Sequence, residues 1–141
     1  MARADKVVSF PWDAQYRISQ ALCVGNLVFV SGQAAIDENG NTVGEGDFLA
    51  QGHQAFANLH RVLEGAGSSL DNVVKVTIFV TDMANFQNVV ELRGQYFAEP
   101  YPADTIVEVR SLALPALQIE IEAIATVADE KGLLERLGDA I

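Results

Sequence analysis

The sequence predicts a single α+β domain in which two helices cover one face of a β-sheet. Five short segments, either rich in β-branched residues or alternating between apolar and polar residues, are the predicted strands: 19–23, 27–30, 73–81, 105–110 and 118–127. Two longer segments, 47–65 and 82–97, repeat apolar residues at three- and four-residue spacing, which is typical of helices with one apolar face. Two such helices fit together on the same side of one sheet.

The first half of the chain predicts a hairpin followed by a helix. Gly25 and Asn26 separate the first two strands and are a turn signal for an antiparallel pair. Gly32, just after the second strand, marks either a β-bulge or a close approach of the backbone to a ligand. Asp47 is the expected N-cap of the first helix. The predicted apolar stripe of this helix is Phe48, Gly52, Ala55, Phe56, Leu59, Val62, Leu63 and Ala66.

The second helix is expected to begin at Asp82 and to end near Phe97, before Pro100 and Pro102. Its predicted inward residues are Phe86, Val89, Val90 and Phe97. Leucines at helical spacing in 129–141 predict a short C-terminal helical extension. This extension is expected to follow the one domain at 1–128 and not to form a second domain.

The last strand has an acidic face. Ile119 and Ile121 point to one side, while Glu120 and Glu122 point to the other, and ionised carboxylates are not left buried and unpaired. This second face must therefore meet water, a ligand or a partner subunit. The sheet face away from the helices is expected to carry Lys75, Thr77, Phe79, Ile106, Glu108, Arg110, Gln118, Glu120, Glu122 and Ile124. The mixture of apolar and charged residues predicts a subunit interface and a closed oligomer, with Glu122 paired to Lys75 or Arg110.

Composition and charge limit the function classes. The 141 residues fit one domain, and the formal charge of -10 disfavours nucleic acids and anionic membranes as partners. No apolar run approaches the roughly 20 residues needed to span a bilayer, and the N-terminal residues do not resemble a signal peptide. The single cysteine, Cys23, excludes an intramolecular disulfide. We therefore expect a soluble, cytoplasmic protein.

Few residues suggest chemistry by their type and spacing alone. His53 and His60 are seven residues apart on one predicted helix, about 10 Å along its axis, so no shared metal site is expected. Cys23 lies in an apolar strand and is interpreted as an inert core thiol. Ser31 either satisfies a bulge with its hydroxyl or contacts a ligand.

Several segments together resemble the Rid family, also called the YjgF or L-PSP family, over about residues 15 to 128. They are Val-Gly-Asn-Leu-Val-Phe-Val-Ser-Gly-Gln at 24–33, Asn-Leu at 58–59 with the run 62–70, Val-Val-Lys-Val-Thr at 73–77, Thr-Asp-Met at 81–83, Pro-Ala at 102–103, Val-Glu-Val at 107–109 and Ile-Glu-Ile-Glu-Ala-Ile-Ala at 119–125. The resemblance implies a chorismate-mutase-like fold with a mixed sheet. It also implies a homotrimer around a central β-barrel, with ligand clefts between subunits.

The best-known branch of this family hydrolyses enamines and imines to 2-keto acids and ammonia without a cofactor. By resemblance, Glu120 positions the water as a general acid or base, and the backbone at Ser-Gly helps to bind the substrate. An Arg that follows Pro-Ala in that branch binds the substrate carboxylate, but this chain has Asp there. Ile18 and Val90 also replace residues that are usual in the family. The expected substrate-binding residues are therefore Ser31, Gly32, Asp104, Thr105, Ile18 and Val90.

The acidic residue at position 104 changes the expected ligand. Arg offers a carboxylate two parallel hydrogen bonds, whereas Asp repels it, so 2-imino acids should bind poorly unless Arg17, Arg93 or Arg110 supplies the cation. Together with Glu120, Asp104 would form an acidic cleft that prefers an amine, an iminium or an uncharged polar ligand. Alternatively, Asp104 caps its own backbone before a strand.

Two functions remain open from the sequence. The first is a cofactor-free hydrolase or deaminase that acts on a small enamine, imine or related amine, with weak or no activity on standard 2-imino acids. The alternative is a non-enzymatic trimer that binds a small molecule or has a regulatory role. A third label of the family, ribonuclease or translation inhibitor, is disfavoured by the charge of -10.

Overall fold

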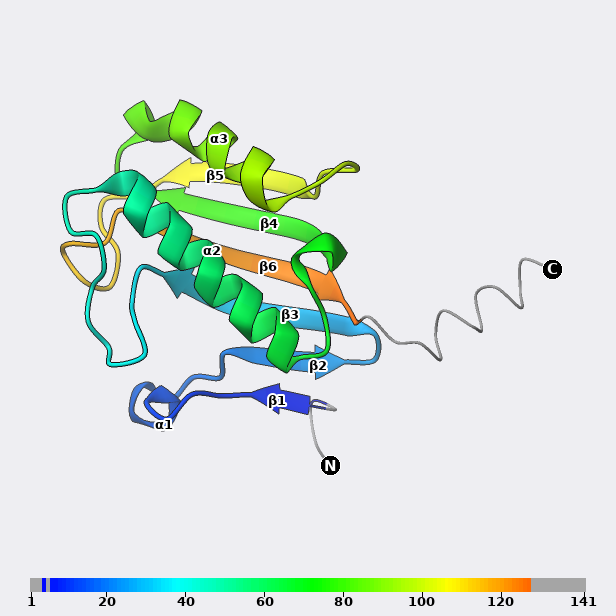
Figure 1. Ribbon diagram of the computed structural model, residues 1–141. Coiled ribbons are helices and arrows are strands. Elements are labelled where there is room, and N and C mark those ends of the chain that lie inside the picture. The colour runs from blue at the N-terminus through cyan, green and yellow to red at the C-terminus, as the bar shows by residue number, and fades with distance from the viewer. Residues whose placement is uncertain (1–3, 5, 128–141) are drawn as a thin grey trace.

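The computed structural model describes residue 4 and residues 6–127, which form one six-stranded sheet with helices on one face (Figure 1). The strands are β1 (Lys6–Val8), β2 (Ala21–Val24), β3 (Leu27–Ala34), β4 (Val73–Val80), β5 (Ala103–Glu108) and β6 (Ile119–Thr126). Their order in the sheet is β1-β2-β3-β6-β4-β5, and every neighbouring pair is antiparallel except the parallel pair β4 and β5. The helical extension predicted for 129–141 lies outside the described residues.

The helices are α1 (Asp13–Tyr16), α2 (Phe48–Gly65) and α3 (Phe86–Tyr96), with 3-10 turns η1 (Leu70–Asn72) and η2 (Met83–Asn85). The side chain of Asp47 accepts a hydrogen bond from the Ala50 amide at 3.1 Å and caps α2, as predicted. Every residue of the predicted apolar stripe of α2 is buried. No helix in the described part of the chain is long and apolar enough to cross a membrane.

The second long helix differs in part from the prediction. Asp82 caps η2 rather than α3, by accepting a hydrogen bond from the Ala84 amide at 2.9 Å. Val89 and Phe97 are buried as predicted, but Phe86 and Val90 are exposed. Helix α3 lies beside β5, at the border of the sheet (Figure 1), and its buried residues are only Val89 and Leu92, so the stripe that it buries is narrow.

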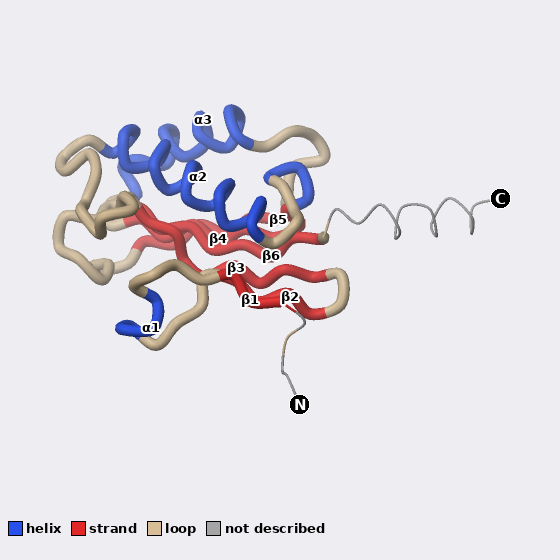
Figure 2. The backbone as a smooth tube through the Cα atoms, turned by 60° about the horizontal axis from the view of Figure 1, so that its bottom comes forward, coloured by secondary structure: helices blue, strands red, loops and turns tan. Residues whose placement is uncertain are grey.

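The register of the parallel pair β4 and β5 corrects the prediction of which β5 residues lie on the sheet face away from the helices. The side of the sheet without α2 and α3 is its open face (Figure 2). Buried Ile78 pairs with Ile106 and buried Val80 pairs with Glu108, so both β5 residues lie on the helix face, contrary to the prediction. Residues 106 and 107 are both apolar, so alternation alone could not distinguish the two faces. The open face of β5 instead carries residues 105 and 107.

The bulge predicted at Gly32 is present between β3 and β6. Val30 pairs with Ala123 and Gln33 pairs with Ile121, so two residues of β3 stand opposite one residue of β6. The strand bends here and turns the backbone of Ser31 and Gly32 away from the regular ladder. This bend is the point around which the candidate site is built.

Candidate functional site

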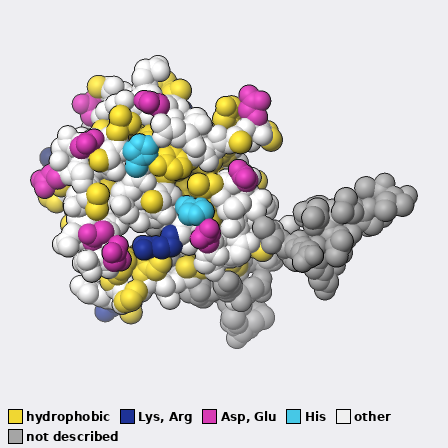
Figure 3. All heavy atoms as spheres, viewed as in Figure 1, with side chains coloured by type: hydrophobic (Ala, Val, Ile, Leu, Met, Phe, Trp, Pro, Cys, Tyr) yellow, Lys and Arg dark blue, Asp and Glu magenta, His cyan; other side chains and the backbone are white. Residues whose placement is uncertain are grey.

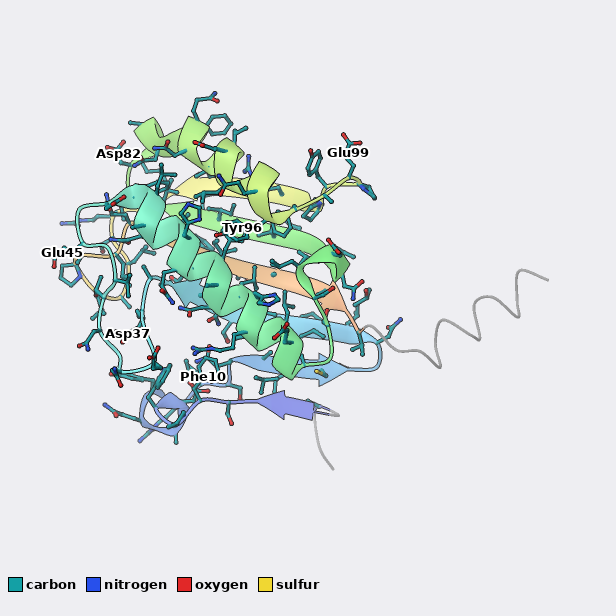
Figure 4. The ribbon with its side chains drawn as sticks, viewed as in Figure 1. Phe10, Asp37, Glu45, Asp82, Tyr96 and Glu99 are labelled. Atoms are coloured by element: carbon teal, nitrogen blue, oxygen red, sulfur yellow. The ribbon has the colours of Figure 1, made fainter. Side chains whose placement is uncertain are left out.

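A hollow of about 620 Å³ lies at the end of β3, and three of the sequence-predicted site residues line it: Ile18, Gly32 and Glu120. Its walls come from the N-terminal segment, from the loop after β3 and from the loop before β6. Figure 4 labels Phe10 and Asp37, which mark the N-terminal segment and the loop after β3. Pockets of this size hold small organic ligands in proteins generally.

Two buried amide side chains of α2 fix both loops. The Asn58 amide donates hydrogen bonds of 2.8 Å to the carbonyl oxygens of Ala34 and Ile36. The Gln51 amide donates a hydrogen bond of 2.8 Å to the carbonyl oxygen of Ala116. Loop backbone that leaves a sheet needs such partners when water is excluded, and these bonds make the walls of the hollow a rigid extension of α2.

A buried polar chain holds the N-terminal segment on β3. Gln33 Nε2 donates to Gln20 Oε1 at 2.8 Å, and Gln20 Nε2 donates to Asp13 Oδ1 at 2.6 Å. The second carboxylate oxygen of Asp13 accepts the Phe10 amide at 2.6 Å. Sequence reasoning missed this chain. The available signal was Gln33, a polar residue on the inward side of an otherwise apolar strand.

Glu120 lies directly over the bulge. A Cβ atom on Gly32 would stand 2.5 Å from Glu120 Oε1 and 2.8 Å from its Cδ, so glycine leaves the room that this carboxylate occupies. Within the described residues, no hydrogen bond or ion pair engages the Glu120 carboxylate. Burial raises the pKa of Glu120, and the neighbouring charge of Glu122 raises it further. A half-buried, unpaired carboxylate of this kind is a stronger base than an ordinary glutamate and is free to bind water or substrate.

The raised pKa predicts a stability effect. The ionised form of Glu120 is less favourable in the folded chain than in the unfolded chain, so Glu120 lowers stability above its folded pKa. This loss disappears below the unfolded value, about 4.3 for glutamate. We expect Glu120→Gln to have a higher Tm than the wild type at pH 7, with a gap that closes as the pH falls toward about 4. Thermal melts across this range test the sign, and a lower Tm for Glu120→Gln at pH 7 would contradict it.

Asp104 does not share this hollow within one chain. Its pairing with buried Val76 places it on the helix face, whereas Glu120 pairs with Phe79 on the open face. Arg93 Nη2 of α3 donates to Asp104 Oδ1 at 2.6 Å, and the two side chains are only 22% and 18% exposed. The predicted acidic cleft of Asp104 and Glu120 is therefore absent from the single chain, because the β4–β5 register directs Asp104 toward α3. The alternative prediction, that Asp104 caps its own backbone before the strand, is not observed either, because the carboxylate pairs with Arg93 instead.

The other predicted site residues fall into two groups. Ser31 donates its hydroxyl to the carbonyl oxygen of Ser19 at 2.6 Å and its amide to the carbonyl oxygen of Gln20 at 2.8 Å, so the bulge is bonded to the N-terminal segment. Ser31 and Ile18 also line a second hollow of about 520 Å³ together with Arg17. Thr105 lies instead on the border strand β5, next to Asp104 in the sequence, and Val90 lies on α3, three residues before the Arg93 that pairs with Asp104. Figure 1 shows that this border is separated from β3 by β4 and β6.

Both histidines and Lys75 have local partners. His53 Nδ1 and the Tyr96 hydroxyl form a hydrogen bond of 2.6 Å, while His60 Nε2 lies 3.0 Å from Glu64. Lys75 donates to Thr105 Oγ1 at 2.9 Å and to the carbonyl oxygen of Val76 at 3.1 Å, so it does not pair with Glu122 within the described chain, and a pairing across subunits stays a prediction. Among the described residues, no group of three or more His, Cys, Asp or Glu side chains could hold a metal ion.

Comparison with known proteins identifies relatives of the whole described domain. The family model described as Endoribonuclease L-PSP matches residues 11–127. The chain is 43% identical to RutC family protein PH0854 of Pyrococcus horikoshii, over 76% of this chain and 84% of that protein. It is 35% identical to the 2-iminobutanoate/2-iminopropanoate deaminase of Dermatophagoides farinae, over 77% of this chain and 84% of the relative. The structure of RidA from an Antarctic Psychrobacter superimposes with a TM-score of 0.73 at 37% identity, covering 78% of this chain and 88% of the other. These matches confirm the predicted fold class.

Proposed function

Since the chain belongs to the endoribonuclease L-PSP family, also called Rid or YjgF, we propose that it is a hydrolase that deaminates a small imine or enamine. Glu120 is the reacting carboxylate. The observation that carries the proposal is its position over Gly32, unpaired and with a raised pKa, at the side of a hollow that can hold a small ligand. Deaminase names among the relatives point to the same class of reaction.

In the proposed reaction the substrate enters as its protonated iminium. The Glu120 carboxylate accepts a proton from water while the water oxygen bonds to the iminium carbon, which gives a carbinolamine. Glu120 then returns that proton to the amine nitrogen, the C–N bond breaks, and ammonia leaves with the bonding electrons. The hydroxyl proton of the carbinolamine passes to the departing ammonia, so iminium and water become a keto compound and ammonium. Water is the only co-reactant.

The substrate differs from the standard 2-imino acids in this proposal. Asp104 stands at the position where the deaminase branch is expected to carry its carboxylate-binding Arg, and the neighbouring Arg93 is already paired with it. An ion pair in this setting presents little net charge to a ligand carboxylate. Without a free cation from this position, binding must depend more on the side chain of the substrate, so we expect weak or no activity on 2-iminopropanoate, whose side chain is only a methyl group.

We also propose a homotrimer that closes through the open face. Phe29 lies between buried Val28 and Val30 in β3, so its side chain points to the open face, where it is 44% exposed. Exposed aromatic residues interleaved with charges are typical of subunit interfaces. In such an assembly the β5 border of one subunit, with Asp104, Thr105 and Val90, would meet the β3 end of the next subunit near Glu120. The two groups of predicted site residues would then form one inter-subunit cleft.

A non-enzymatic trimer that binds a small molecule is the second candidate. It is favoured by the residues at 18, 90 and 104, where this chain departs from the family pattern on which the deaminase site is expected to depend. A ribonuclease role has the least support. The formal charge is -10, and basic side chains are few among the acidic ones on the face shown in Figure 3.

A wild-type assay separates these functions. An amino acid oxidase generates 2-imino acids in solution from alanine, leucine or phenylalanine, and keto acid release is compared with the spontaneous rate. We expect at least a roughly tenfold acceleration for the larger imines and little for 2-iminopropanoate, since general acid–base catalysis contributes about 10²- to 10⁴-fold. Equal rates with and without protein for every imine would favour the binding-only trimer.

A further inference from the structure

A cation lies in the same hollow as Glu120. Arg61 of α2 is the only basic residue that lines this hollow within the described chain. Its guanidinium carbon lies 4.6 Å from the centre of the Phe10 ring. Within the described residues, Arg61 makes no hydrogen bond or ion pair, whereas Arg93 is held by Asp104 and Lys75 by Thr105. The N–H donors of Arg61 are therefore available to a ligand.

The ring beneath Arg61 is itself fixed in place. The Phe10 amide donates to Asp13 at 2.6 Å, and the Phe10 ring contacts Trp12 with centroids 5.1 Å apart. A guanidinium stacked on an aromatic ring is held by the cation–π attraction while its N–H edge stays free. That edge matches the two oxygens of a carboxylate and binds them with charge-assisted hydrogen bonds. Arg61 is therefore prepared for an anion before any ligand arrives.

Charges within the hollow give a ligand one orientation. Glu38 and Glu120 line the same space as Arg61. A carboxylate is attracted to Arg61 and repelled by the two glutamates, whereas an iminium is attracted to the glutamates. A ligand that carries both groups is therefore expected to bind with its carboxylate at Arg61 and its nitrogen toward the two glutamates, of which Glu120 is the proposed base. This is the orientation that the proposed hydrolysis requires.

Apolar side chains line the same hollow. Ile18 is 49% exposed and Leu114 is 39% exposed, and both line the hollow with Trp12. Large apolar side chains left in contact with water around a concave site favour an apolar ligand body. A volume of about 620 Å³ also exceeds what a three-carbon imine needs.

We propose that Arg61 binds the carboxylate of the substrate, and that the substrate is an imino acid with a large apolar or aromatic side chain packed on Trp12, Ile18 and Leu114. The inference rests on the proposed function for the reaction itself. Arg61 supplies from α2 the cation that position 104 on β5 lacks. The binding step depends only on the hollow, so it can be tested without turnover.

Trp12 provides the signal, since it is the only tryptophan of the chain and lines the hollow. The purified full chain is titrated with 3-phenylpropanoate and with its uncharged amide, 3-phenylpropanamide, and Trp12 fluorescence is followed. We expect the wild type to bind the acid more tightly than the amide. In Arg61→Leu the Kd of the acid should rise roughly ten- to a hundredfold, as loss of a charge-assisted bond predicts, while the Kd of the amide stays within about threefold.

Arg110→Leu is the matched control, because Arg110 is exposed and does not line the hollow, and it should bind like the wild type. Arg61→Lys keeps the charge and should fall between the wild type and Arg61→Leu. An unchanged preference for the acid in Arg61→Leu would overturn the inference, as would no fluorescence response in the wild type or loss of acid binding in Arg17→Leu alone. Arg61-dependent binding without hydrolysis of any imine would contradict only the proposed function. Hydrolysis with Arg61-independent binding would contradict only the role of Arg61.

Discussion

Glu120→Gln is expected to lower kcat/KM for imine hydrolysis by roughly 10²- to 10⁴-fold, the contribution typical of a general acid–base group. Glutamine keeps the shape and the hydrogen-bonding reach of the side chain but cannot accept a proton from water. The pKa of Glu120 is raised by burial, so its carboxylate is a better proton acceptor than an exposed one. Keto acid release from an imine generated in solution measures the loss, with the spontaneous rate subtracted.

Two variants of neighbouring positions control this result. Gly32→Ala places a Cβ atom 2.5 Å from Glu120 Oε1, so the flexible carboxylate must move while the backbone stays in place. Its activity should fall between those of the wild type and Glu120→Gln. Glu122→Gln removes an exposed carboxylate two residues away and should change kcat/KM by less than Gly32→Ala does. Equal activity of the wild type and Glu120→Gln would remove Glu120 from the mechanism.

Phe29→Asp is expected to dissociate the proposed trimer and to abolish activity with it. Phe29 pairs with Ile124 across the centre of the open face and is 44% exposed in the single chain. An unpaired carboxylate in an apolar interface weakens the free energy of association by about 2 kcal/mol or more. Because the three subunits are identical, every interface of the closed ring would carry this substitution. Light scattering should report chains of 15.2 kDa in place of an assembly three times that mass.

The control is Ala57→Asp, which introduces the same carboxylate on the helix side. Ala57 is exposed on α2 and lies away from both the open face and the β5 border. It should leave both mass and activity unchanged. A wild-type chain that scatters light as a monomer, or a Phe29→Asp variant that retains the wild-type mass, would show that the open face is not the interface.

Local patterns allowed much of the fold to be predicted. The stripe of α2 and its Asp47 cap follow from the spacing of residues a few positions apart in the sequence. The hairpin turn at Gly25 and Asn26 and the bulge at Gly32 are encoded equally locally. Glu120 could be singled out for the same reason, since strict alternation in β6 sets it apart from Ile119 and Ile121.

Features that depend on register between distant segments were not predictable in this way. Nothing in the alternation of β5 reveals which of its faces meets buried Val76, so the pairing of Asp104 with Arg93 appears only in three dimensions. Strand β1 and helix α1 are three and four residues long and too short to give a periodic signal. In the sequence, Arg61 looks like an ordinary exposed helix residue, and only the structure shows that its guanidinium lies over the Phe10 ring.

The pH dependence of kcat/KM for the hydrolysis of a large apolar imino acid tests the central claim most directly. After subtraction of the spontaneous rate, wild-type activity should rise with pH as Glu120 ionises, with an apparent pKa above the ordinary glutamate value of about 4.3. This rise of activity with pH should be missing in Glu120→Gln. A wild-type profile that coincides with that of Glu120→Gln at every pH would contradict the assignment of Glu120 as the acid–base group of this protein.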